Sequence, residues 1–63
     1  MRSYECQLLG AAGEICVREP IESDSDGAAL ALCRNIFAAR RHHKSFELWR
    51  LQRLIWSEGR RAD

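Results

Sequence analysis

The stretch SFELWRLQRLIWS (residues 45–57) decides the fold of this chain, because it fits two templates. Apolar and polar side chains alternate over residues 46–50, which is typical of a half-buried strand, and residues 53–56 can pair with them through a turn at Leu51-Gln52. Apolar residues in the same stretch also recur at helical spacing. A hairpin here completes a sheet, whereas a helix gives a helix-turn-helix pair with the preceding segment.

That preceding segment, residues 28–41, predicts a helix. It is rich in good helix formers and contains no proline or glycine. Its apolar residues form one stripe at three- and four-residue spacing, namely Ala29, Leu32, Cys33, Ile36 and Phe37. The polar run ESDSDG (residues 22–27) supplies N-cap residues and acids that suit the positive end of a helix.

The first third of the chain predicts a β-hairpin. Residues 4–8 alternate between apolar and polar side chains, and the small-residue turn GAAG (residues 10–13) follows. Alternation then resumes with Ile15 and Val17 on one face. Pro20 has no N–H to donate, so this second strand is expected to end there or to lie at an edge.

The order of these segments resembles a group of small alphaproteobacterial proteins of unknown function. The matching motifs are MRSY (1–4), LLGAAG (8–13), DSDGAA (24–29), FELW (46–49) and RLI (53–55), so the resemblance spans about residues 1–56. It implies a ββαββ fold and carries no established activity. This chain departs from the group at Arg50-Leu51-Gln52, where the group has a link that contains glycine.

We therefore predict one α+β domain over residues 1–57, followed by a charged disordered tail over residues 58–63. An N-terminal hairpin, one helix and a C-terminal strand or hairpin form the ββαββ fold, with the helix on one face of a small antiparallel sheet. The expected core is Tyr4, Cys6, Leu8, Ile15, Val17, Leu32, Cys33, Ile36, Phe37, Phe46, Leu48 and Leu54. The other face is expected to carry Trp49, Ile55 and Leu9 as a candidate interaction surface.

The three cysteines are predicted to be free thiols that fill the core or its margin. Their odd number and the absence of an apolar signal segment at the start favour a reducing cytoplasm over a secreted disulfide framework. No apolar run approaches the roughly 18 residues that a membrane span needs. The adjacent His42 and His43 have no paired cysteine motif, so we predict no metal site and no cofactor.

Charge is divided unevenly along the chain. Residues 1–27 carry six acidic and two basic side chains, whereas residues 28–63 carry eight basic and three acidic ones. Arginines near tryptophans can contact phosphates while the rings stack on bases. The candidate nucleic-acid contacts are Arg40, Arg41, His42, His43, Lys44, Arg50 and Arg53.

No arrangement of residues in the sequence indicates catalysis. The acidic run around Asp24 and Asp26 is only a fragment of a calcium loop, and no cysteine follows a recognisable activating motif. We expect a non-catalytic interaction or accessory module in the cytoplasm, with a homodimer or another protein as its partner. The alternative is a nucleic-acid-binding protein that uses the basic and aromatic C-terminal half.

Overall fold

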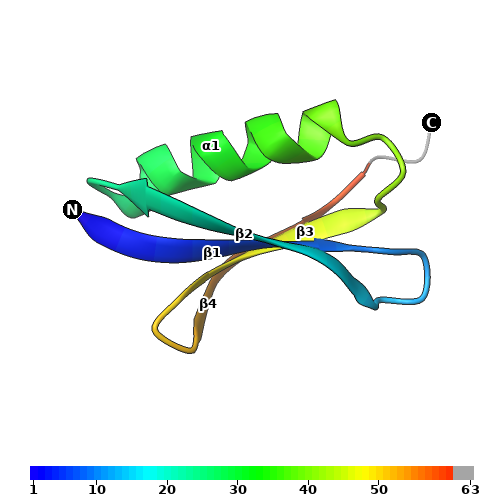
Figure 1. Cartoon of the computed structure of the whole chain (residues 1–63), viewed down its shortest axis with the longest axis horizontal. Coiled ribbons are helices and arrows are strands. Elements are labelled where there is room, and N and C mark those ends of the chain that lie inside the picture. Colours follow the sequence, from blue (N-terminus) through cyan, green and yellow to red (C-terminus); the bar gives the residue numbers. More distant parts are fainter. Residues whose placement is uncertain (61–63) are drawn as a thin grey trace.

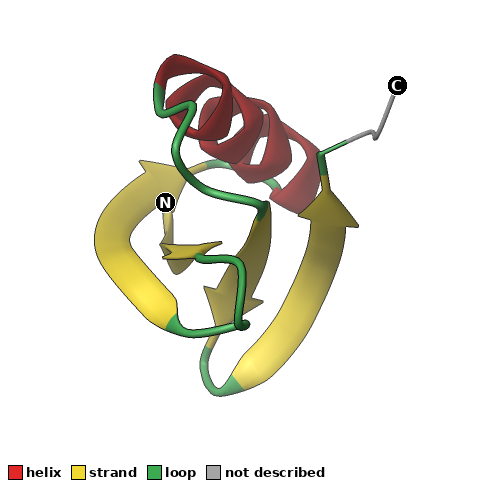
Figure 2. Ribbon diagram, turned by 90° about the vertical axis from the view of Figure 1, so that its right-hand side faces the viewer, coloured by secondary structure: helices red, strands yellow, loops and turns green. Residues whose placement is uncertain are grey.

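The structure, a computed structural model that describes residues 1–60, confirms the predicted ββαββ order. The elements are β1 (Arg2–Leu9), β2 (Ile15–Ser23), α1 (Asp26–Ala39), β3 (Ser45–Arg50) and β4 (Arg53–Gly59). All neighbouring strands are antiparallel, in the order β2-β1-β3-β4. The helix crosses one face of the sheet (Figure 1), and the sheet curves beneath it (Figure 2).

Strand β1 is one of the two inner strands of the sheet, and alternate side chains of this strand belong to the core. Its side chains alternate as the sequence predicts, so that Tyr4, Cys6 and Leu8 are buried under the helix. In the register with β3, Cys6 lies opposite Leu48 and Leu8 opposite Phe46, and both of these β3 residues are fully buried. The core therefore lies between α1 and the two inner strands.

The helix begins at one of the predicted caps. The Ser25 hydroxyl accepts a hydrogen bond from the Ala28 N–H at 3.2 Å, which satisfies one of the free donors of the first turn. Ala29, Cys33 and Phe37, each four residues apart, form the buried line on the sheet side. The Phe37 ring meets the Phe46 ring at a centroid distance of 5.1 Å, which joins the end of the helix to β3.

The other end of the helix is capped by Arg60, which follows β4. Its guanidinium donates to the carbonyl oxygens of Phe37 and Arg40 at 3.1 and 2.9 Å, and lies 4.1 Å from the centroid of the Phe37 ring. The Phe37 carbonyl also accepts the Arg40 N–H at 3.2 Å, and the Arg40 carbonyl accepts the His43 N–H at 3.5 Å, so Arg60 adds further donors at the end of the helix. The boundary predicted after residue 57 thus lies inside β4, and residues 61–63 of the predicted tail lie outside the described residues.

Two bulges account for two of the three predicted core residues that are exposed. Cys16 is an extra residue in β2 where the register with β1 shifts, and Ile55 is an extra residue in β4 where the register with β3 shifts. Ile15 and Leu54 were predicted to be buried, yet they are 45% and 44% exposed, because each bulge reverses the alternation beyond it.

Three further corrections concern the core. Leu32 is 44% exposed, since the buried line of the helix is narrower than the predicted apolar stripe. Ile21 and Ala29 are buried although neither was in the predicted core. Val17 and Ile36, which were in it, are partly buried against the core cluster.

The cysteines differ from the prediction of three free thiols. Cys6 in β1 and Cys33 in α1 form a disulfide that closes a loop with a sequence separation of 27. Both residues are fully buried, as predicted, but they are covalently joined. Cys16 is free and exposed, and not a core filler, because it is the extra residue of the β2 bulge.

Reduction of this disulfide is expected to destabilise the domain. A cross-link over a loop of this length restricts the unfolded chain and contributes about 3 to 4 kcal/mol. Urea unfolding of the protein with and without reductant should show a loss of this order, and the variant C6A/C33A should resemble the reduced protein. The variant C16S is the control and should unfold like the parent chain. Equal stability with and without reductant contradicts a structural role for the disulfide.

Candidate functional site

The sheet face opposite the helix carries a cluster of two carboxylates and an indole ring. Glu5 and Gln7 from β1 lie opposite Trp49 and Glu47 from β3 in the strand register, so all four point to the same side. The Gln7 amide donates to Glu5, and the Trp49 Nε1–H donates to Glu47 at 3.0 Å. We call these four residues the Glu–Trp block. Carboxylates therefore lie on two sides of the ring.

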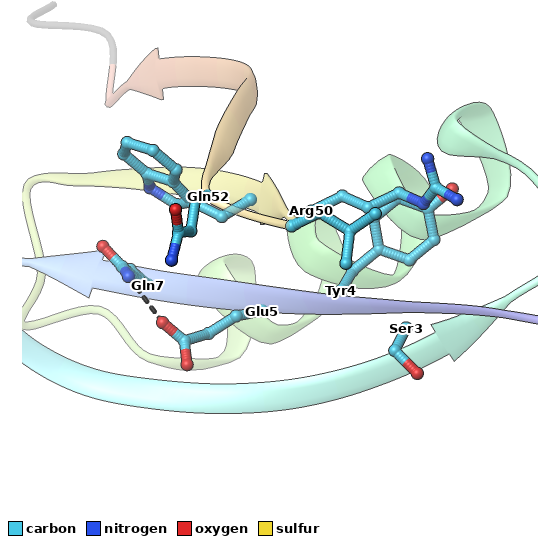
Figure 3. A pocket seen from close by; sticks show the side chains of 8 residues that line it. Ser3, Tyr4, Glu5, Gln7, Arg50 and Gln52 are labelled. Atoms are coloured by element: carbon cyan, nitrogen blue, oxygen red, sulfur yellow. Dashed lines mark hydrogen bonds between the residues drawn. The ribbon is translucent and has the colours of Figure 1, made fainter.

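A pocket of about 410 Å³ lies beside this block, between β1 and the β3–β4 hairpin. It exists because pairing between β1 and β3 ends at Glu5 and Trp49, whereas β1 continues to Arg2. In Figure 3 the side chains of Glu5, Gln7 and Gln52 gather at one end, while Arg50 extends alongside Tyr4. Ser3, Trp49 and Leu51 complete the lining.

The chemistry of this pocket suits a cationic group. An indole face attracts an ammonium or a guanidinium through its ring quadrupole, and a carboxylate accepts its charge-assisted hydrogen bonds. Glu5 and Trp49 supply both, directly across from each other on neighbouring strands. Sequence reasoning named Trp49 but missed Glu5 and Glu47. The register between β1 and β3 brings Glu5 to the ring, whereas Glu47 lies two residues before Trp49 in β3, so the alternation of that strand was the signal that could have found it.

The hairpin next to the pocket turns at Leu51-Gln52, as the strand interpretation of residues 45–57 predicts. Both residues have positive φ, 51° and 64°, the conformation of a two-residue turn that asparagine and glycine favour. Each such residue costs about 1 to 2 kcal/mol in this region. Leu51 is also 81% exposed, so it adds an apolar side chain to the tip of the hairpin without any packing gain.

The predicted interaction surface of Trp49, Ile55 and Leu9 is divided. Trp49 and Leu9 lie on the uncovered face, Leu9 toward the far end of β1. Ile55 was predicted there too, but it packs against the core cluster on the helix side, because the β4 bulge turns it inward. Leu54, predicted to be core, is on the uncovered face opposite Trp49.

The predicted nucleic-acid contacts lie at two ends of the molecule. The basic run Arg40, Arg41, His42, His43 and Lys44 connects α1 to the start of β3, where the Lys44 N–H donates to the Leu9 carbonyl at 2.9 Å. Arg50 and Arg53 flank the hairpin turn at the opposite end of β3 (Figure 1). The Arg40 guanidinium is within 3.7 Å of the Glu19 carboxylate. The fold thus separates the candidates into two groups.

A second pocket, of about 400 Å³, lies on the helix side of the same hairpin. Arg50, Arg53 and Asp26 supply its polar lining. Asp26 is already engaged, because the Tyr4 hydroxyl donates to its carboxylate and the Arg2 guanidinium lies 3.2 Å from it. The hydrogen bond from Tyr4, and then the charge of Arg2, hold the pKa of Asp26 below its usual value of 3.8. We call this hollow the arginine pocket.

Leu51 and Gln52 are expected to lower the stability of the protein, because neither residue favours the conformation of this turn. The variant L51N/Q52G has the residues that this turn favours, so it should be more stable by about 1 to 2 kcal/mol. Chemical denaturation measures the gain. The variant L51A/Q52A is the control: it removes the same side chains but keeps the unfavourable conformation, and should gain little. A destabilised L51N/Q52G protein contradicts this account of the turn.

Asp26 is expected to give the fold a pH dependence in the acid range. Since the pKa of its carboxyl is lower in the folded protein, ionised Asp26 stabilises the fold above its unfolded pKa. This stabilisation is lost as the pH falls below about 4, through the folded pKa. Thermal melts between pH 7 and 2 should show a weaker acid dependence in D26N than in D24N, the control in the adjacent loop. Equal profiles for the two variants contradict the role of Asp26.

Comparisons with protein-family models, with curated proteins and with solved structures returned no match to this chain. Within residues 1–60, no group of three or more histidine, cysteine, aspartate or glutamate side chains could hold a metal ion. The helix found in this part of the chain has 14 residues and is too short to cross a bilayer. A function therefore has to be argued from the geometry of the two pockets and the uncovered face.

Proposed function

We propose that this protein is a non-catalytic interaction module that binds a basic segment of a partner protein on its uncovered sheet face. The observation that carries the proposal is the cross-strand pair of Glu5 and Trp49 at the pocket beside the β3–β4 hairpin. This pair offers a carboxylate and an aromatic ring to the same cation. A lysine or arginine side chain of the partner is the group that fits both.

The charge of the whole uncovered face supports a basic partner. Strand alternation and register place Glu5, Glu22 and Glu47 on this face. The one basic residue that β1, β2 and β3 place there is Arg18. Acidic groups arranged over one face attract a cationic segment and speed its encounter. The apolar side chains of Leu51 and Leu54 lie at the hairpin end, where they can cover the aliphatic stem of the bound residue.

The same features make a second copy the less suitable partner. Two copies that met through this face would bring their glutamates together, and like charges that face each other in an interface are unfavourable. Sheet extension is also hindered, because the edge strands β2 and β4 each contain a bulge, and β2 contains Pro20. The expected homodimer stays a prediction, and the experiment below separates it from a different partner.

Nucleic-acid binding by the whole basic set has less support than a protein partner. Its seven candidate residues lie in two groups at opposite ends of β3, so one strand of nucleic acid would have to pass along the molecule to meet both. Cytoplasmic localisation also stays a prediction. In that compartment the Cys6–Cys33 disulfide would have to resist reduction, and its full burial favours such resistance.

Binding of a hexa-arginine peptide to the full chain tests the proposal. Amide chemical shifts in an NMR titration should move at Glu5 and Trp49, together with the indole N–H of Trp49. Loss of one carboxylate in E5Q or E47Q should weaken binding about tenfold, which corresponds to roughly 1.4 kcal/mol for one charge-assisted contact.

The variant D24N is the matched control, because it removes one negative charge from the loop before α1 and leaves the Glu–Trp block intact. Equal weakening by D24N and E5Q would mean that only net charge matters, and would refute the proposed site. Sedimentation equilibrium without peptide addresses the second copy. A stable dimer that E5Q and E47Q make tighter would assign this face to self-association instead.

A further inference from the structure

We propose that the arginine pocket binds a phosphate monoester dianion between Arg50 and Arg53. This site is separate from the Glu–Trp block, since it lies on the helix side of the hairpin and has the opposite charge. Phosphate binding at this site can therefore be tested independently of the interaction module proposed above. The two pockets share the start of the hairpin turn, because Arg50 and Leu51 line both of them, whereas Arg53 lines the arginine pocket but not the pocket beside the Glu–Trp block.

Two arginines of like charge are paired across the hairpin turn. Arg50 and Arg53 are direct cross-strand partners on either side of the turn, an arrangement that destabilises a hairpin. Within residues 1–60, carboxylates form ion pairs with Arg2, Arg34 and Arg40, and neither Arg50 nor Arg53 has such a partner. An anion between the two guanidinium groups would turn this repulsion into two attractive contacts.

The side chains around the arginine pocket carry a positive net charge. Asp26 is the acidic residue of the lining, and it is bound to Tyr4 and to Arg2. With Arg2, Arg50 and Arg53 against this one carboxylate, the surplus is two positive charges. A phosphate monoester carries a charge of about −1.5 to −2 at pH 7, which matches the surplus. A phosphodiester carries a single negative charge and matches it less well.

The size and the lining of the arginine pocket also suit a phosphate group. Guanidinium groups present planar pairs of N–H donors that fit phosphate oxygens in a bidentate manner. The pocket, at about 400 Å³, is in the usual range for small-molecule sites. Leu51 and Ile55 add apolar walls, which can contact the organic part of a monoester. The ligand class we infer is a small phosphorylated metabolite, with inorganic phosphate as its minimal form.

An NMR titration of the full chain at constant ionic strength tests this assignment. The probes are inorganic phosphate, ribose 5-phosphate and dimethyl phosphate. Saturable shifts at Leu51, Arg53 and Ile55 are expected with the first two probes, and much weaker ones with the diester. Tighter binding of ribose 5-phosphate than of phosphate would show that the apolar walls contact the organic part. Equal binding would assign the site to free phosphate.

Variants at the two arginines give the discriminating result. Both R50Q and R53Q should weaken phosphate binding about tenfold or more, and R53K should have an intermediate effect because it keeps the charge but loses the planar donor pair. The control is R18Q, which removes the same charge from the opposite face and should bind like the parent chain. The amide spectrum of each variant reports directly whether its fold is retained.

Three results would overturn the proposal. Equal weakening in R18Q and R53Q would reduce the effect to net charge. Dimethyl phosphate or a short single-stranded RNA that binds better than the monoester would assign the arginines to nucleic acid. Absence of saturable shifts at the hairpin in the parent chain would mean that the pocket does not bind phosphate.

Discussion

The bond between Cys6 and Cys33 fixes the middle of the helix over the middle of the sheet. Cys6 belongs to β1, one of the two inner strands that are hydrogen-bonded on both edges, so the cross-link joins the helix to the inside of the sheet. A chain of 63 residues can bury little apolar surface, and nine hydrophobic residues form the core within the described part of this one. The disulfide therefore supplies restraint that a larger core would otherwise provide.

One helix covers one face, so the two faces of the sheet differ in the side chains that they expose. The uncovered face remains polar around Trp49, whereas the helix side ends in arginines near Asp26. The β3–β4 hairpin separates these two environments, so a single two-residue turn borders an acidic surface on one side and a basic hollow on the other. Leu51, held at the tip in an unfavourable conformation, contacts both. Leu51 keeps this conformation because the paired strands on either side of the two-residue turn impose it.

The sequence predicts the order of the helix and strands well. It predicts which face of the sheet a side chain lies on only where no bulge interrupts the strand. Alternation in β1 and the four-residue spacing of the helix placed Tyr4, Cys6 and Phe37 correctly, because each pattern runs uninterrupted. In β2 and β4 an extra residue reverses the pattern, so Ile15 was expected inside and Ile55 outside. The two carboxylates of the candidate site were missed for a related reason. The proximity of Glu5 to Trp49 is a property of the register between β1 and β3, which the sequence alone does not determine, whereas Glu47 follows from alternation within β3 once that segment is taken as a strand.

The cap formed by Arg60 also bears on the order in which the chain becomes structured as it is synthesised. The carbonyls that Arg60 satisfies belong to residues 20 and 23 positions earlier. On a ribosome, where the chain emerges from its N-terminus, β1, β2 and α1 are complete before β3 and β4 are available. Until then the last turn of the helix lacks the hydrogen bonds from Arg60, and Phe37 lacks its contact with Phe46. The nascent chain therefore exposes one side of its helix until the final residues of the sheet have been added.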